Sequence, residues 1–168
     1  MRRARALGGV VGIVLVLVVA LVAATAGSGA LAPQRTLVVE DTETGETYLT
    51  VPVANGTEVA LEYTHSVEQT RVYDEYTVRG DRLVMTRMEF ESYGWGLPAG
   101  ANVTRENGTF VFDPEGAYTR LTVSPGSVAG HTLIVGQERY DLVAMSDERA
   151  VDIYLTRRSA LAAATDSL

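Results

Sequence analysis

The sequence contains no cysteine and no lysine among its 168 residues. The lack of cysteine excludes disulfide bonds, zinc–thiolate sites, iron–sulfur clusters and thiol catalysis. It also excludes the attachment of a lipid to a cysteine. Every basic residue is therefore an arginine, and there are 14 of them.

Positive charge is scarce as well, because the 14 arginines stand against 21 acidic residues. Four of these arginines lie within the first 35 positions, so the rest of the chain is strongly acidic. An acidic surface repels polyanions, which argues against nucleic acid as a partner. An acidic, lysine-free composition also suits a protein that must stay hydrated in concentrated salt, and we expect a salt-loving source.

An uncharged apolar segment occupies residues 7–26, directly after Arg2, Arg3 and Arg5. About twenty such residues cross the hydrocarbon core of a membrane as a helix. The arginines predict a cytoplasmic N-terminus and an extracytoplasmic remainder. A cleaved signal peptide is the alternative, because Ala24-Thr-Ala26 fits a cleavage site. We therefore expect a cell-membrane protein with an anchor or signal peptide over residues 1–26 and its main domain outside.

The remaining chain divides into a linker, a domain and a tail. A flexible linker is predicted over residues 27–35, a β domain over 36–156 and a tail over 157–168. No amphipathic helix is expected within the domain. Strand-like segments separated by turn signals include residues 36–40, 47–53, 57–65, 71–79, 82–91, 109–112, 118–123, 132–135, 140–145 and 150–156. This spacing predicts an all-β fold, an antiparallel β-sandwich or barrel of about nine to ten short strands, preceded by one transmembrane helix.

The pairing of the two longest predicted strands can be worked out from the turn between them. A two-residue turn at positions 80–81 pairs Tyr76 with Met85. The same count pairs Asp74 with Arg87 as a cross-strand ion pair. A slip of one residue would move every side chain to the other face of the sheet.

The most unusual chemistry lies between residues 63 and 98. The stretch Tyr63-Thr-His65-Ser66-Val-Glu68 is followed by Glu75, Glu89 and the glycine-rich Ser92-Tyr93-Gly-Trp95-Gly-Leu-Pro98. Alternation places the histidine on the inward face at the end of its strand. It is either part of a hydrogen-bonded polar plug or part of a binding site. The candidate binding residues are His65, Ser66, Glu68, Glu75, Glu89, Tyr93 and Trp95.

Residue types used by three kinds of enzyme occur in this stretch. His65 and Ser66 point to opposite faces of a strand, so they cannot form a nucleophile–base pair. His65 with nearby carboxylates falls short of a usual zinc ligand set, and His131 adds a ligand only if the fold brings it close. Carboxylate pairs for glycoside chemistry are too common in an acidic chain to be informative. We expect no catalytic residue, no metal and no cofactor.

Three N-x-[ST] sequons begin at Asn55, Asn102 and Asn107. Two of them, Asn55 and Asn107, are followed by glycine and lie at predicted turns, where a glycosylating enzyme has access. The three asparagines are therefore candidate glycosylation sites.

The motif from Tyr63 to Glu68, the downstream Glu75 and the segment Phe90-Glu-Ser-Tyr-Gly-Trp-Gly-Leu-Pro98 resemble an uncharacterised family, domain of unknown function eighteen-fifty. The family pattern maps onto His65, Ser66, Glu68, Glu75, Tyr93, Gly94, Gly96 and Pro98. The resemblance implies a small exported or membrane-anchored protein, encoded beside TRAP transporters of the TAXI type. It implies an accessory or binding role beside a solute receptor or permease, and no catalytic residue can be transferred from it. The alternatives are a metal-assisted hydrolase and a purely structural envelope protein.

Overall fold

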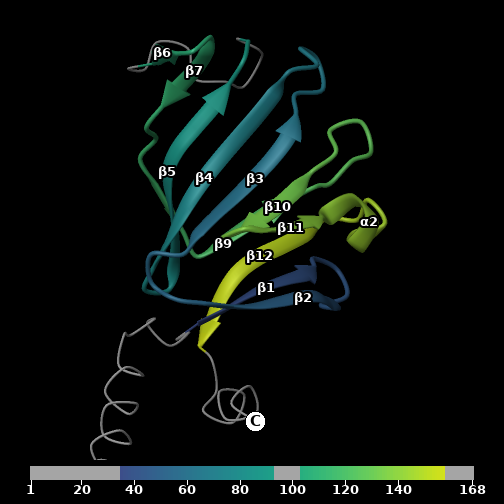
Figure 1. Ribbon diagram of the computed structural model, residues 1–168. Helices are drawn as coiled ribbons and strands as arrows, with labels where there is room; N and C mark the ends of the chain where they lie inside the picture. Colours follow the sequence, from purple (N-terminus) through teal and green to yellow (C-terminus); the bar gives the residue numbers. More distant parts are fainter. Residues whose placement is uncertain (1–34, 93–102, 158–168) are drawn as a thin grey trace, which may run out of the picture. The chain divides into compact units, whose positions relative to one another are not determined.

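The computed structural model describes residues 35–92 and 103–157, which form twelve strands and one short helix (Figure 1). The first five strands are β1 (Arg35–Asp41), β2 (Thr47–Val53), β3 (Glu58–Thr64), β4 (Arg71–Arg79) and β5 (Arg82–Phe90). They are followed by β6 (Thr104–Glu106), β7 (Thr109–Phe112), β8 (Gly116–Tyr118), β9 (Arg120–Val123), β10 (Thr132–Val135), β11 (Glu138–Asp141), the helix α2 (Leu142–Ser146) and β12 (Val151–Arg157).

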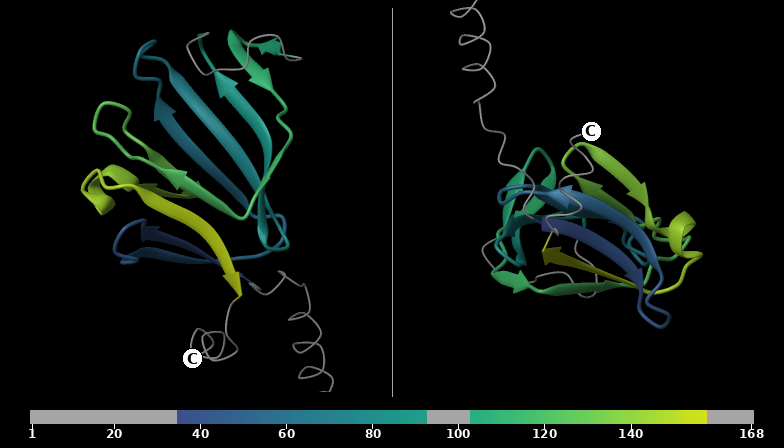
Figure 2. Two further views of the ribbon diagram at one scale, coloured as in Figure 1. Left: turned by 180° about the vertical axis from the view of Figure 1, so that it is seen from behind. Right: turned by 90° about the horizontal axis from the view of Figure 1, so that it is seen from below.

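The strands form two sheets in which every pairing is antiparallel. The smaller sheet has the order β2-β1-β12-β9, and the larger has the order β11-β10-β3-β4-β5-β7-β6, with β8 also paired to β5. The sheets meet where β12 contacts β5, and they diverge toward the C-terminal ends of β3 and β5 (Figures 1 and 2). The prediction of a mostly β fold with antiparallel sheets is confirmed.

The main core lies between the two sheets and takes side chains from both. Its buried members are Leu37, Val39, Val53, Val123, Val151 and Ile153 on the smaller sheet, Val59, Leu61, Tyr76, Val78, Leu83, Leu133 and Val135 on the larger sheet, and Leu142 on α2. On β4 this core extends from Val78 only as far as Tyr76. The other half of the inner face of β4, toward Val72, therefore lies outside this core.

The number of strands is higher than expected partly because one predicted strand changes sheets. Residues 118–123 were expected to be continuous, but the chain bends at Thr119. Before the bend β8 pairs with β5 of the larger sheet, and after it β9 pairs with β12 of the smaller sheet. Both halves have strand chemistry, so the pattern of apolar residues gave no sign of the break.

The strand predicted over residues 140–145 is correct only for its first two residues, and a short helix that was not predicted replaces the rest. Strand β11 ends at Asp141, and α2 follows at once over Leu142–Ser146. The carboxylate of Asp141 accepts a hydrogen bond from the backbone N–H of Ala144 at 3.0 Å. An aspartate in this capping position satisfies a free N–H of the first helical turn, which favours the helix over a longer strand.

The pairing of β4 with β5 contains a β-bulge that the sequence prediction missed. Tyr76 lies opposite Met85 as expected, but the register shifts between Glu75 and Tyr76. Asp74 therefore lies opposite Met88, and the predicted ion pair between Asp74 and Arg87 is wrong. The physical reason is the extra residue in β5, which leaves one position of that strand without a partner.

Within residues 35–92 and 103–157, no helix has the length and apolar character that crossing a bilayer requires. The predicted anchor over residues 7–26 lies outside the described residues, as do Tyr93, Trp95, Asn102 and positions 158–168. What the sequence predicts for these residues stays a prediction.

Candidate functional site

A row of mostly aromatic side chains crosses the inner face of the larger sheet where β3 ends. Backbone pairing aligns Tyr63 with Val72, Val72 with Phe90, and Phe90 with Phe110. His131, one residue before β10, stacks on Tyr63 with ring centroids 5.1 Å apart and planes 16° apart. Phe90 stacks on Phe110 with centroids 5.4 Å apart. We call these five residues the aromatic row.

Asp74 lies on the same face of β4 as Val72, two residues further along the strand. Its side chain is buried, with a relative exposure of 9%. The Tyr63 hydroxyl donates a hydrogen bond to Asp74 Oδ2 at 3.3 Å. The other oxygen, Oδ1, is buried and has no hydrogen-bond partner, and the same holds for Nδ1 of His131. The two oxygens of a carboxylate can accept several hydrogen bonds, so Asp74 uses only a small part of its acceptor capacity.

Burial dominates the electrostatics around Asp74. It raises the pKa of the Asp74 carboxyl to about 6, with the Tyr63 hydrogen bond acting weakly in the opposite direction. Burial, and then the negative charge of Asp74, raise the pKa of the Tyr63 and Tyr76 hydroxyls. Burial lowers the pKa of His131, so its imidazole is neutral at pH 7. At neutral pH the carboxylate is therefore the one group of this cluster that carries a charge.

The row next to Asp74 is apolar. Leu61 and Met88 flank Asp74 on the neighbouring strands, and Phe112 lies beyond Met88. Met88, Phe112 and Tyr63 keep partial exposure, whereas Leu61 is buried. Ligand pockets are lined mostly by apolar and aromatic side chains with a few well-placed polar groups, and these residue types occur together here.

Asp41 is a second buried carboxylate, and its hydrogen bonding is complete. Its exposure is 2%, and its Oδ1 accepts the backbone N–H groups of Glu43 and Thr44, each at 2.8 Å. Its Oδ2 accepts the Tyr48 hydroxyl at 2.9 Å and pairs with Arg149 at 3.2 Å. These hydrogen bonds lower the pKa of Asp41 to about 2, chiefly those from the two backbone groups. Each oxygen thus has two partners.

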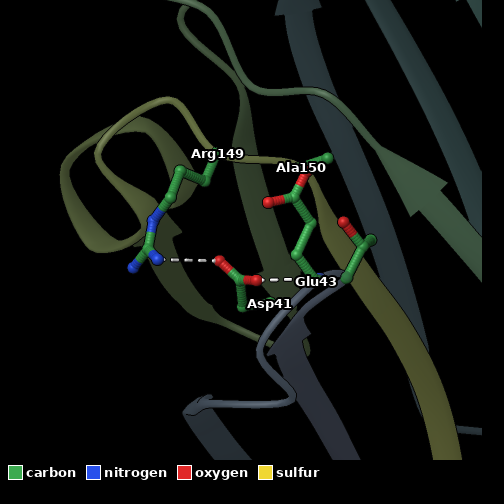
Figure 3. A pocket seen from close by; sticks show the side chains of 5 residues that line it. Asp41, Glu43, Arg149 and Ala150 are labelled. Atoms are coloured by element: carbon green, nitrogen blue, oxygen red, sulfur yellow. Dashed lines mark hydrogen bonds and ion pairs between the residues drawn. The ribbon is translucent and has the colours of Figure 1, made fainter.

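The hollow beside Asp41 is lined by Asp41, Thr42, Glu43, Arg149 and Ala150 and measures about 110 Å³ (Figure 3). Figure 3 shows the Arg149 guanidinium and the Glu43 backbone approaching the carboxylate from opposite sides. Because both oxygens of this carboxylate are used, the arrangement closes the turn between β1 and β2. The Asp41 carboxylate itself therefore keeps no free acceptor position for a ligand.

His65, the centre of the sequence motif, closes the turn that follows β3. Its Nδ1 accepts the backbone N–H of Glu68 at 3.2 Å, and its own backbone N–H donates to the Thr70 carbonyl at 2.8 Å. The side chain is half-buried, while Ser66 and Glu68 are exposed. The imidazole is thus held by the backbone N–H of Glu68.

Glu75 and Glu89 lie on the outer face of the larger sheet, opposite to Asp74. Glu75 accepts the Thr86 hydroxyl at 3.0 Å. Glu89 pairs with Arg71 at 3.3 Å and with Arg87 at 2.8 Å. These pairs belong to a chain of alternating charges across the outer face, made of Arg139, Glu62, Arg71, Glu89, Arg87 and Glu106.

The five candidate binding residues that the structure describes are therefore not gathered into one centre: His65, Ser66 and Glu68 lie at the turn after β3, and Glu75 and Glu89 lie on the outer face of the larger sheet. Among residues 35–92 and 103–157, no three His, Cys, Asp or Glu side chains are grouped so that they could hold a metal ion. Of the sequons, Asn55 and Asn107 are exposed and lie on turns. The Asn55 Oδ1 accepts the Gly80 N–H at 2.8 Å, which leaves its amide nitrogen outside that bond. Glycosylation itself stays a prediction.

Sequence reasoning missed Asp74, and it did not place His131. A signal was present, because Val72, Asp74, Tyr76 and Val78 alternate along β4 with a single acid on an otherwise apolar face. That acid was explained by an ion pair with Arg87, which the bulge prevents.

Three buried polar atoms in the described part of the chain lack a hydrogen-bond partner: Asp74 Oδ1, His131 Nδ1 and Ser146 Oγ. Serine, histidine and aspartate are the residue types of a hydrolytic triad. Because each of these atoms has no partner, no two of them are hydrogen-bonded to each other. The nucleophile–base pair that defines such a triad is not formed.

Comparison with known proteins adds one match. No curated protein and no solved structure matches the chain. A family model described as Domain of unknown function (DUF1850) matches residues 59–142, which is half of the chain. The matched segment includes Tyr63, Asp74 and His131, whereas Asp41 and Arg149 lie outside it. The chain belongs to the DUF1850 family.

Proposed function

We propose that this protein is a membrane-anchored, extracytoplasmic binding protein that serves a solute uptake system of the TRAP (TAXI) type. The anchor and its orientation are supported by the uncharged segment 7–26 and the arginines that precede it. The link to a transporter is supported by the family resemblance of the motif between Tyr63 and Pro98. The domain binds a solute or a segment of a transporter subunit.

The binding role rests on one observation, the unsatisfied carboxylate of Asp74 beside the aromatic row. Burying a charge without a full set of hydrogen bonds opposes folding. Such a group is retained at a site where something else completes its bonding, as destabilising residues commonly are at functional positions. Asp74 and its neighbours Tyr63 and His131 also fall within the family match.

Binding fits this cluster better than catalysis. The Tyr63 hydroxyl donates to Asp74 and has a raised pKa, so it is a poor nucleophile at neutral pH. Among the unpartnered buried atoms of the described residues, the one hydroxyl is that of Ser146, and no base is bonded to it. A carboxylate beside aromatic rings can still orient and recognise a ligand.

Co-purification from native membranes tests the function. The full chain with a C-terminal tag is isolated in mild detergent, and the proteins that accompany it are identified beside those from an untagged strain. We expect a TRAP solute receptor or permease to be enriched with the tagged chain. Recovery of neither subunit above the untagged control would contradict the transporter role.

Protease treatment of intact cells tests the topology separately. A C-terminal tag should be removed by a protease added outside, because the arginines hold the N-terminus in the cytoplasm. A tag that is digested only after lysis would place the domain inside the cell and would overturn the proposed location.

A further inference from the structure

Two buried aspartates of this domain differ in how completely the fold satisfies them. Asp41 accepts two backbone N–H groups and a tyrosine hydroxyl and also pairs with Arg149. Asp74 accepts a single hydrogen bond, from Tyr63, and its Oδ1 has none. The fold is therefore able to surround a buried carboxylate with donors, and at Asp74 it does not. What is missing at Asp74 is a donor, and in particular one with positive charge.

Among the described residues, the side chains beside Asp74 leave Oδ1 without a donor. The Tyr76 hydroxyl faces the site but makes no hydrogen bond to Oδ1, and Nδ1 of His131 makes none either. Because burial lowers the pKa of His131, its imidazole brings no positive charge at pH 7. On the flanking strands lie Leu61 and Met88, which carry no hydrogen-bond donor in their side chains. A ligand that completes this site supplies the donor itself, and a positively charged donor also balances the carboxylate.

The surface beside the carboxylate suits an apolar body. Tyr63, Met88 and Phe112 are partly exposed on this face. Aromatic faces attract cations as well as apolar groups, because their π electrons carry partial negative charge. The domain is acidic, so its field raises the local concentration of cations and lowers that of anions.

We infer that the site formed by Asp74, Tyr63, Met88 and Phe112 binds an organic cation, an ammonium or guanidinium group carried on an apolar or aromatic body. The charged nitrogen pairs with the Asp74 carboxylate, and the body packs against Tyr63, Met88 and Phe112. This inference rests on the proposed function and names the chemistry of its ligand. The cation is either a free solute or an arginine or lysine side chain of a transporter subunit.

Binding of three probes of similar shape tests the class of ligand. Benzylammonium, benzyl alcohol and benzoate are titrated into the purified full chain in neutral detergent at pH 7.5, with calorimetry as the readout. We expect benzylammonium to bind at least about tenfold more tightly than the other two, because a charge-assisted hydrogen bond is replaced by a neutral or repulsive contact.

Two variants make the test specific. Asp74→Asn keeps the size of the side chain and removes its charge, and it should weaken benzylammonium binding at least about tenfold. Glu58→Gln makes the same change of net charge at the exposed start of β3, and it should bind as the wild type does. A melting curve of each variant shows that it is folded. Equal affinity for the three probes, no binding of benzylammonium at millimolar concentration, or full binding by Asp74→Asn would each overturn the inference.

The benzylammonium titration and the co-purification together identify the source of the cation. If benzylammonium releases the transporter subunit and Asp74→Asn fails to recover it, the cation is a side chain of that subunit. If recovery is unchanged while benzylammonium binding depends on Asp74, the cation is a free solute. Absence of any transporter subunit from the wild-type preparation contradicts the proposed function alone, because the probe titration is independent of it.

Discussion

The hydroxyl of Tyr63 donates to Oδ2 of Asp74 across 3.3 Å, and it is the single hydrogen bond that this carboxylate receives within the described part of the chain. Burial therefore dominates, and the pKa of Asp74 rises to about 6. In the unfolded chain an aspartate has a pKa of about 3.9. The folded state thus favours the protonated acid, and ionisation of Asp74 opposes folding.

The first prediction concerns the unfolding free energy as a function of pH. The protonated form of Asp74 stabilises the folded state; this contribution is present in full below pH 4 and is lost as the pH rises through 6. Its loss should amount to about 2–3 kcal/mol of unfolding free energy by pH 7.5. Tyr63, Tyr76 and His131 also face this site, and the lowered pKa of His131 acts in the opposite direction between pH 5 and 7. The measurement is therefore the difference between wild type and Asp74→Asn in urea unfolding at pH 4.5 and 7.5. A difference that does not change with pH would contradict the raised pKa.

The second prediction concerns the partner of Asp74. In Tyr63→Phe the aromatic ring remains to stack on His131, but the hydrogen bond to Oδ2 is lost. Because that bond lowers the pKa of Asp74, its removal should raise the pKa further above 6. Carbon-13 NMR titration of labelled aspartate carboxyls measures the shift. Tyr154→Phe, which loses a hydroxyl bond to Glu40 on the smaller sheet, is the matched control and should leave the Asp74 pKa unchanged.

Much of the fold could be predicted because its strands obey simple rules. The bounds of β2, β4, β7 and β10 agree with the sequence expectation, since turn residues flank each run of strand-forming residues. The turn at residues 80–81 also fixed the first pairs of β4 with β5 correctly. These features depend on residues that are close in sequence.

The candidate site could not be found in the same way, because it depends on one extra residue in β5. Beyond the bulge every pair differs from the simple count, so Asp74 faces Met88 and not Arg87. Arg87 lies instead on the outer face and pairs with Glu89 and Glu106. A bulge has no reliable sequence signature, and a shift of one position changes which side chains share a face.

The third prediction concerns His65, which the motif suggested as a central residue. His65→Ala removes the acceptor for the Glu68 N–H in the turn after β3. Because this turn is exposed and water can replace the lost bond, the unfolding free energy should fall by only about 0.5–1.5 kcal/mol. Benzylammonium affinity should change less than it does in Asp74→Asn. Normal stability with loss of all probe binding would show that His65, and not Asp74, carries the site.

The last prediction compares the two buried aspartates directly at pH 8, where both are ionised. Asp41→Asn should lower the melting temperature, because the amide nitrogen that replaces an oxygen cannot accept from Tyr48 or pair with Arg149. Asp74→Asn should raise the melting temperature, because it removes a buried charge that no cation of the described residues balances. Arg149→Met serves as the control for the first change, and its effect should not add fully to that of Asp41→Asn. Differential scanning calorimetry of the three variants and the double variant decides the outcome. Opposite signs would separate an aspartate that stabilises the fold from one that is kept for a ligand, whereas a fall in melting temperature for Asp74→Asn would make Asp74 a structural residue like Asp41.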